Sequence, residues 1–270
     1  MRARELAIAS SVALMVLLLA YVIELGGLGP LAPHTIRDLA KSYLEYAYNP
    51  WNATVSSMAL EAVTAIVWDY RGLDTYFETS VLFVAIIGVA ALYRGYREMR
   101  GLGGAGLSEI VKTSTRVLVP LILVAGASIA IHGHLTPGGG FQGGSFMAVL
   151  MVLLAVVFSL DYAFERGLSS RKLLAIRSAG LIGILLTSLA LLVAGAVAGV
   201  YAYVFQNMVR ESSELSMPRW IFDRPLGGTL FFFNVFESLA VVSGLTLTFI
   251  VLALRREEVD HALAAGEWYE

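Results

Sequence analysis

The chain has 270 residues, of which 57% are hydrophobic and only 15% are charged, and it contains no cysteine. A soluble domain carries about a quarter charged residues, so this composition indicates a polytopic helical membrane protein. The formal net charge of −2 excludes the basic footprint of a nucleic-acid-binding protein, and the missing cysteines exclude disulfides, thiolate metal sites and thiol catalysis.

Apolar runs predict an all-α fold with about six membrane-spanning helices, because about 20 apolar residues are needed to cross a bilayer. The predicted spans are Leu6–Ile23, Thr79–Tyr93, Val117–Ile131, Phe146–Tyr162, Leu173–Phe205 and Gly227–Leu254. The first run is long and ends without a clear small-residue cleavage site, so we interpret it as a retained span rather than a signal peptide. A further apolar stretch, Met58–Trp68, is too short to cross and predicts a partial or interfacial helix.

The positions of Lys and Arg predict the orientation in the membrane. If the N-terminus is inside, the inner segments hold 13 of the basic residues and the outer segments hold 6. The positive-inside rule then places both termini in the cytoplasm and the loop after Ile131 on the outer side. The residues counted as inner are Arg2, Arg4, Arg94, Arg97, Arg100, Lys112, Arg116, Arg166, Arg171, Lys172, Arg177, Arg255 and Arg256.

Composition also divides the chain along its length. Apolar residues recur at helical spacing from Ile36 to Ala47, which predicts an amphipathic helix on the membrane surface or on a partner. Four glycines crowd into the stretch between the second and third spans, which predicts a linker. The predicted parts are a two-span module (1–100), the Gly-rich linker (101–110), a four-span module (111–256) and a cytoplasmic tail (257–270).

A charged segment, Trp68–Glu78, lies directly before the second span. Charges so close to hydrocarbon are costly unless they pair or meet water. Arg71 could pair with Asp69, with Asp74 or with both, and Glu78 shares a helical face with Asp74 at i,i+4 spacing. The segment is therefore either a charged interfacial turn between two helices or a hydrophilic node on an ion route.

The last span contains a second polar pair, Asn234 and Glu237, which share a helical face at i,i+3 spacing. Glu237 lies about ten residues into the predicted helix, or about 15 Å along its axis, near the middle of the membrane. An intramembrane carboxylate is a candidate functional site, and the alternative is a protonated side chain that bonds a neighbouring helix. The adjacent aromatic run Phe231–Phe233 is expected on a lipid-facing or partner-facing surface.

A glycine-rich segment, Gly133–Ser145, leads into the fourth span. Each glycine costs about 1 kcal/mol inside a helix relative to alanine, so we expect irregular backbone here that is buried in an assembly or lines a water-filled path. Its amides near Gly143–Phe146 could cap the fourth helix. Two histidines alone do not make a metal or haem ligand set, so neither a metal nor a cofactor is predicted. The candidate polar-loop residues are His132, His134, Thr136, Pro137, Gly138, Gly139, Gly140 and Gln142.

The segment Gly133–Gly144, Gly-His-Leu-Thr-Pro-Gly-Gly-Gly-Phe-Gln-Gly-Gly, resembles the motif of the MrpB family, also called MnhB. These proteins are small membrane subunits of multisubunit Na+/H+ antiporters, and the MbhF subunits of membrane-bound hydrogenases are related to them. Pro225–Leu230, followed by Asn234 and Glu237, is similar to the start of the last helix in that family. The resemblance covers roughly Val111 to Leu254.

The N-terminal part resembles a different subunit. Trp68–Glu78 is similar to the Asp-x-Arg-Gly-x-Asp-Thr segment at the C-terminal end of the large MrpA subunit and in the separate MbhE subunit of the hydrogenases. Phe77 stands where that family has glycine, which leaves the local turn in question. The resemblance implies a fusion of an MbhE-like module with an MbhF-like module, joined near Gly101–Gly106.

The family resemblance implies a helical bundle without cofactor or catalytic chemistry of its own, assembled beside larger antiporter-like subunits in a lipid membrane. Its host would be a free antiporter, a hydrogenase or a related sulfur- or formate-coupled complex, and its ions would be Na+ and H+. A scaffold subunit that carries no ion is the alternative, and an enzyme using haem or quinone lacks a ligand set in this chain. The candidate ion-translocation residues are Glu237, Asn234, Asp74, Glu78, Asp69 and Arg71.

Overall fold

The computed structural model describes residues 3–27, 29, 36–52, 54, 56–92 and 106–253. This part of the chain is mostly helical and contains six helices that are long and apolar enough to cross a membrane, which confirms the predicted fold class. The predicted linker is described only from Gly106 onward, and the predicted tail, 257–270, lies outside the described residues.

The chain divides into two compact units, Met1–Lys41 and Ser42–Glu270. The first unit contains α1 (Ala3–Glu24), which confirms the first predicted span. The amphipathic helix expected from Ile36 to Ala47 is α2 (Asp38–Ala47), which begins at the end of the first unit and ends with the buried Ala47 in the second.

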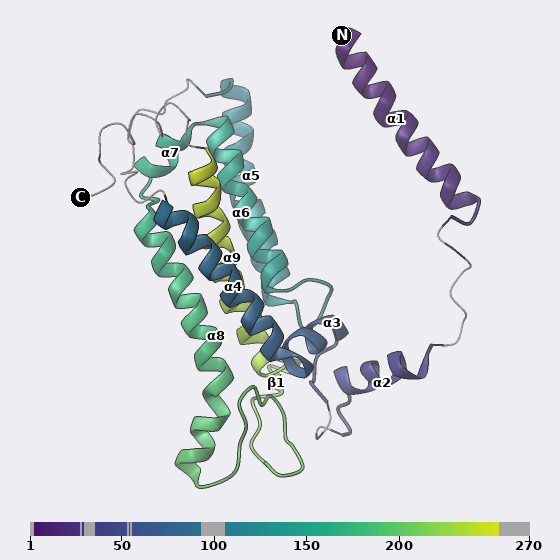
Figure 1. The fold of residues 1–270 in the computed structure, drawn as a ribbon, viewed down its shortest axis with the longest axis vertical. Coiled ribbons are helices and arrows are strands. Elements are labelled where there is room, and N and C mark those ends of the chain that lie inside the picture. The colour runs from purple at the N-terminus through teal and green to yellow at the C-terminus, as the bar shows by residue number, and fades with distance from the viewer. Residues whose placement is uncertain are drawn as a thin grey trace. The chain divides into compact units, whose positions relative to one another are not determined.

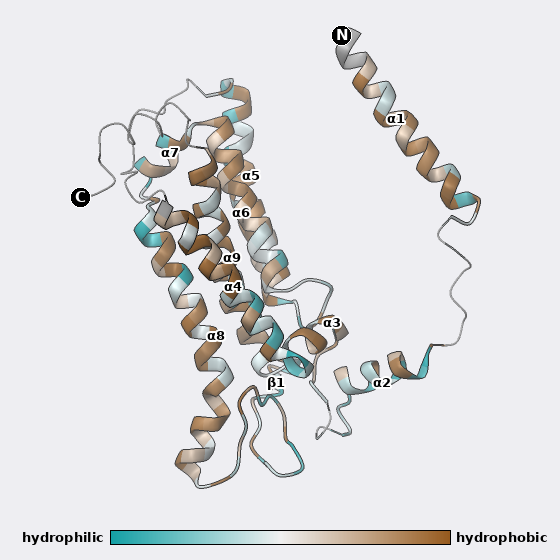
Figure 2. Ribbon diagram, in the orientation of Figure 1, coloured by the Kyte–Doolittle hydropathy of each residue, from teal (hydrophilic) through white to brown (hydrophobic). Residues whose placement is uncertain are grey.

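The second unit is a bundle built around α9 (Thr229–Leu252). This helix packs against α4 (Gly72–Leu92), α5 (Glu109–Ile131), α6 (Gly140–Val157) and α8 (Ser170–Ala198) (Figure 1). Apolar residues predominate along these helices, with hydrophilic residues mainly toward their ends (Figure 2), as expected for segments that cross a bilayer. More of α9 than of any other described span is buried inside the chain, so polar groups on α9 meet protein rather than lipid.

The span boundaries differ from the predicted ones for two reasons. Some helices extend through polar residues beyond the apolar run, and one ends at a glycine in the left-handed conformation. The second, third and fourth spans begin six to eight residues earlier than predicted, at Gly72, Glu109 and Gly140. The fifth ends at Ala198 rather than Phe205, because Gly199 adopts a left-handed conformation (φ 68°) that closes the helix. After α6, Ser159 separates the span from a short helix, α7 (Leu160–Glu165).

The last six of the thirteen residues in the glycine-rich segment are helical, contrary to the prediction of irregular backbone. Residues 132–139 form the turn, and Gly140–Ser145 already belong to α6, so the amides near Gly143–Phe146 are not free caps. The reason is packing. A Cβ atom on Gly143 would lie 2.5 Å from the carbonyl oxygen of Gly126 in α5, so glycine lets the two helices approach more closely than any other residue would.

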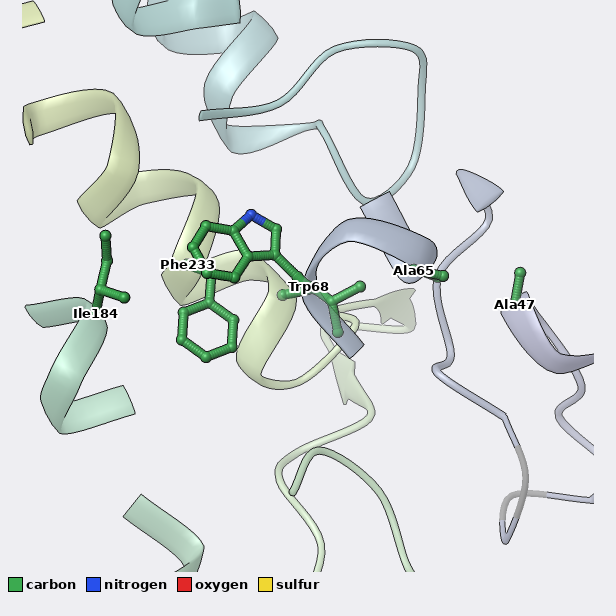
Figure 3. Packing of buried hydrophobic residues seen from close by; sticks show 7 residues of the cluster. Ala47, Ala65, Trp68, Ile184 and Phe233 are labelled. Atoms are coloured by element: carbon green, nitrogen blue, oxygen red, sulfur yellow. The ribbon is translucent and has the colours of Figure 1, made fainter. Parts of the chain in front are cut away.

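The stretch Met58–Trp68 forms only a partial helix, as predicted, although its geometry is unusual. A single turn, α3 (Ala62–Thr64), continues into a π-helix, η1 (Ala65–Tyr70), directly before α4. The π-helix positions the Trp68 ring parallel to the ring of Phe233 in α9, with 4.4 Å between ring centroids (Figure 3). Phe233 is fully buried there, so the expectation that all of Phe231–Phe233 faces lipid or a partner is wrong at this position.

A long loop between α8 and α9 folds back over this end of the bundle. It contains a hairpin of two two-residue strands, β1 (Trp220–Ile221) and β2 (Arg224–Pro225), and an isolated antiparallel bridge between Arg210 and Ser213. The buried Asn207 joins the loop to two other segments. Its side-chain amide donates to the Ser57 carbonyl (3.0 Å), and its side-chain oxygen accepts from the Thr229 backbone N–H at the start of α9 (2.9 Å).

The glycine packing can be tested with a matched pair of substitutions. Gly143→Ala should lower the stability of the protein by about 1–3 kcal/mol, because its methyl group would overlap the α5 backbone. Gly88→Ala, in α4, meets open space and should leave stability unchanged or raise it by up to about 1 kcal/mol, because alanine favours helix. Thermal unfolding in detergent measures both changes. Equal effects at the two positions would contradict close packing at Gly143.

Candidate functional site

The two polar residues predicted in the last span lie together on the buried face of α9. Glu237 lies eight residues into the helix, about 12 Å along its axis. Asn234 accepts a hydrogen bond at its side-chain oxygen from the backbone N–H of Gly140, the first residue of α6 (3.3 Å). A Cβ atom on Gly140 would lie 2.6 Å from Glu237 Oε2, so only glycine leaves room for the carboxylate at this position.

The Glu237 carboxylate has neutral hydrogen-bond donors. They are the backbone N–H of Phe141, at the start of α6, and the indole N–H of Trp68 in η1. Among the described residues, no Lys or Arg forms an ion pair with it. Glu78 of α4 acts on it electrostatically, so the structure brings these two predicted residues close enough to repel each other when both are ionised.

The turn before α6 supplies backbone oxygens and one unsatisfied donor to the same region. Thr64 donates its hydroxyl to the Gly133 carbonyl (2.6 Å), which joins the partial helix to the turn. The side-chain nitrogen of Asn234 is buried and has no hydrogen-bond partner among the described residues. A Cβ atom on Gly133 would lie 2.8 Å from that nitrogen, so it faces the Gly133 backbone. A buried donor without a protein partner can bond to water or a ligand.

The two histidines of the turn have different environments. His134 is buried and bonds the Pro225 carbonyl through Nε2 (3.1 Å), and burial lowers the pKa of its imidazole. It therefore anchors the loop before α9 as a neutral ring. His132 is exposed and bonds Ser128 of α5. The other predicted loop residues are divided in the same way, with Gly139 and Gly140 buried and Thr136, Pro137 and Gln142 exposed.

The charged segment before α4 does not form one node. Asp69 is buried and accepts hydrogen bonds from Ser57 (2.5 Å) and from Arg210 of the long loop (3.2 Å). Arg71 pairs with Asp74 instead, through its Nε (2.7 Å) and Nη2, and both side chains are exposed. Of the two partners considered for Arg71, only Asp74 is therefore confirmed. Burial raises the pKa of the Asp69 carboxyl, against the opposing effects of Ser57 and Arg210.

Arg177, which the orientation count assigned to the inner side, lies inside α8 and is buried. Its guanidinium is buried in a space left by Gly244, donates from Nη1 to the Ala240 carbonyl (3.0 Å) and lies 5.3 Å from the ring centroid of Phe83. Its Nε and Nη2 have no partner among the described residues. Removing Arg177 from the inner count leaves 12 basic residues against 6, so the predicted orientation is unchanged.

Sequence reasoning missed several residues of this region. Trp68 was interpreted only as the boundary between an apolar stretch and a charged segment, although it donates to Glu237 and stacks on Phe233. Asn207 and Arg210 lie in a loop without periodicity, and nothing in their local sequence marks them as partners of Ser57 and Asp69. The described residues contain no group of three or more His, Asp or Glu side chains that could hold a metal ion.

The buried Asp69 generates a pH prediction. Because its pKa is raised in the folded protein, its contribution to stability is fully present below the pKa of an unfolded aspartate and is lost as pH rises through the raised value. The unfolding temperature of the wild type should therefore fall relative to that of Asp69→Asn as pH rises. Ser57→Ala keeps the carboxyl and should retain the pH dependence. Thermal unfolding across mildly acidic to alkaline pH measures this, and parallel curves for the wild type and Asp69→Asn would contradict it.

The fold is found in solved membrane complexes. A chain of the membrane-bound sulfane sulfur reductase, an archaeal respiratory membrane complex, is 28% identical, with a TM-score of 0.58 over 93% of this chain and 98% of that chain. A chain of the Mrp complex from Dietzia sp. DQ12-45-1b has the same TM-score at 22% identity, over 93% of this chain and 26% of that longer chain. The second likeness shows the fold alone.

Sequence relatives point in the same direction. A Na(+)/H(+) antiporter subunit of Bacillus subtilis is 29% identical over 143 residues, which are 52% of this chain and 89% of that protein. An uncharacterized protein of Methanocaldococcus jannaschii, MJ1307, is 25% identical over 227 residues, 77% of this chain and 82% of that protein. The model of a family described as a domain related to the MnhB subunit of Na+/H+ antiporters matches residues 110–247, more than half of the chain. This multi-pass membrane protein therefore belongs to the MnhB-related family and has the fold of subunits of multisubunit membrane complexes.

Proposed function

We propose that this protein is a subunit of an Mrp-type cation/proton antiporter module and that it contributes to the translocation of Na+ and H+ through Glu237. The host complex is a free antiporter or a respiratory complex of the hydrogenase or sulfane sulfur reductase type. The family match and the likeness to a chain of such a respiratory complex support a subunit role. The proposal adds that the subunit takes part in moving the ion.

The proposal rests on one observation: Glu237 is a buried carboxylate inside a membrane span without an ion-pair partner among the described residues. Ionising such a group in an apolar interior is costly, so the carboxyl keeps its proton unless a cation binds and compensates its charge. The neutral donors around it, Trp68 and the Phe141 backbone, hold the side chain in place without supplying a compensating charge.

The surroundings of Glu237 provide the ligands that a hard cation prefers. Na+ requires oxygen ligands, which the carboxylate and the side-chain oxygen of Asn234 supply, together with backbone carbonyls of the turn before α6. Glu237 would alternate between a protonated form and a Na+-bound form, and competition between the two ions at one carboxylate couples their movements. Water at the free Asn234 amide would complete the coordination.

The charged segment before α4 would serve as the entrance to this site. Asp69 and Asp74 are held in ion pairs, whereas Glu78 has no ion pair among the described residues and acts electrostatically on Glu237. Glu78 is therefore the member of this segment that we propose passes ions to or from Glu237. Residues 1–100 would correspond to an MbhE-like module.

The predicted inner segments, which include both termini, hold the excess of basic residues. By the positive-inside rule, this excess supports cytoplasmic termini.

Glu237→Gln tests the carrier role. The amide keeps the shape and the hydrogen bonds of the protonated acid but can neither release a proton nor bind Na+ by charge, so Na+-dependent proton exchange should fall by at least tenfold. The measurement is exchange in vesicles that contain the complete complex. Glu214→Gln, at an exposed position of the long loop, is the matched control and should leave exchange unchanged.

The same variant separates the proposal from a scaffold role. If the chain only holds larger subunits in register, Glu237→Gln complexes that assemble on a native gel would transport at the wild-type rate. Wild-type exchange by assembled Glu237→Gln complexes would therefore overturn the carrier role.

A further inference from the structure

An apolar groove of about 440 Å³ opens on the bundle at the end of α6 that is remote from Glu237. α5, α6, α8 and α9 form its walls, and α7 lies across one end. Its floor is a buried hydrophobic cluster that includes Met151, Ala163 and Leu173. The hydroxyl of Ser243, which also lines the groove, already donates to the Leu239 carbonyl (2.5 Å), so it offers little to a polar ligand.

Cations lie at the α7 end of the groove. The Arg166 guanidinium is stacked on the ring of Tyr162, 3.6 Å from its centroid, and both residues line the groove. The ammonium of Lys172, at the start of α8, donates to the carbonyl of Gly167, another lining residue (2.7 Å). Both cations are at least partly exposed and therefore able to meet a ligand.

The acids nearby do not cancel this charge. From residue 161 to residue 172 the chain has two acids, Asp161 and Glu165, and three bases, Arg166, Arg171 and Lys172. Across the α6–α7 junction, Arg116 of α5 adds a further cation, 5.7 Å from the ring centroid of Phe158. The groove is thus apolar along its walls and positive at its mouth.

We propose that this groove binds an anionic glycerophospholipid, with an acyl chain along α6, α8 and α9 and the phosphate between Arg166 and Lys172. Basic pockets between membrane helices on the cytoplasmic side bind anionic headgroups, and the basic-residue count predicts that side for α7. An α-helix with side chains is about 10 Å across, so a groove of this volume would hold only about one turn of a partner helix. A flexible acyl chain fits the same space along its length.

The first test needs no variant. The full chain, purified with the subunits that accompany it, is incubated in detergent with phosphatidylglycerol or with phosphatidylcholine, washed, and examined by native mass spectrometry. We expect retained phosphatidylglycerol and little phosphatidylcholine. Equal retention of the two lipids would overturn the proposal, because it would mean that the groove holds lipid without recognising its charge.

The second test locates the site. Removing both cations in Arg166→Gln/Lys172→Gln should weaken phosphatidylglycerol retention by roughly tenfold or more. Filling the groove with Leu150→Trp should abolish it. Arg219→Gln/Arg224→Gln removes the same charge from within and directly before the hairpin at the other end of α9, and it should leave retention of phosphatidylglycerol unchanged.

Wild-type retention by the groove variants, or loss in the hairpin variant alone, would overturn the assignment. A cross-link from Leu150→Cys to a partner subunit would also overturn it, because a protein would then cover the groove. The chain has no cysteine of its own, so a single introduced cysteine reports on this position. These outcomes do not depend on ion transport through Glu237.

Discussion

The close approach of α6 to α9 at Gly140 is the constraint on which the rest of the candidate site depends. A side chain at Gly140 would occupy the space of the Glu237 carboxylate, and a side chain at Gly143 would force α5 away from α6. Without these approaches, Asn234 could not accept from the α6 backbone. The glycines at 140 and 143 therefore let α6 lie close enough to its neighbours for the buried Glu237 carboxylate to reach hydrogen-bond donors at the start of α6.

Charges in this molecule fall into two energetic classes. Arg71 and Asp74 form an exposed pair, whose contribution to stability is about 0–1 kcal/mol. Asp69, Glu237 and Arg177 are buried, where an ionised group costs several kcal/mol unless it is compensated. Asp69 is compensated by Arg210 and Ser57, whereas Glu237 and Arg177 have only neutral partners among the described residues. The cost of burying an ionised side chain therefore remains largely uncompensated at Glu237 and Arg177.

Much of the fold could be predicted from the sequence because hydropathy locates helices that must cross a bilayer. All six spans were found, and the amphipathic helix was found from its periodicity. The helix ends were less predictable, because glycine is unfavourable in an isolated helix yet favourable where two helices touch. Gly140–Ser145 were assigned to a loop for this reason, and Arg177 was counted with the inner basic residues although it lies inside the fifth span and is buried.

The candidate site was predictable only where its partners are local in sequence. Asn234 and Glu237 are three residues apart on one helix, and their shared face follows from helical geometry. Trp68, by contrast, reaches Glu237 from a segment more than 160 residues away, and Arg210 reaches Asp69 across 141 residues. Such contacts depend on tertiary packing that a single sequence does not encode locally.

The π-helix η1 contains Trp68 and Asp69, the two residues that make these distant contacts. Deleting one residue there would rotate the following side chains by about 100°, turning the indole and the neighbouring acid away from their distant partners together. The one extra residue per turn of the π-helix therefore determines whether Trp68 and Asp69 face Glu237 and Arg210, far along the chain.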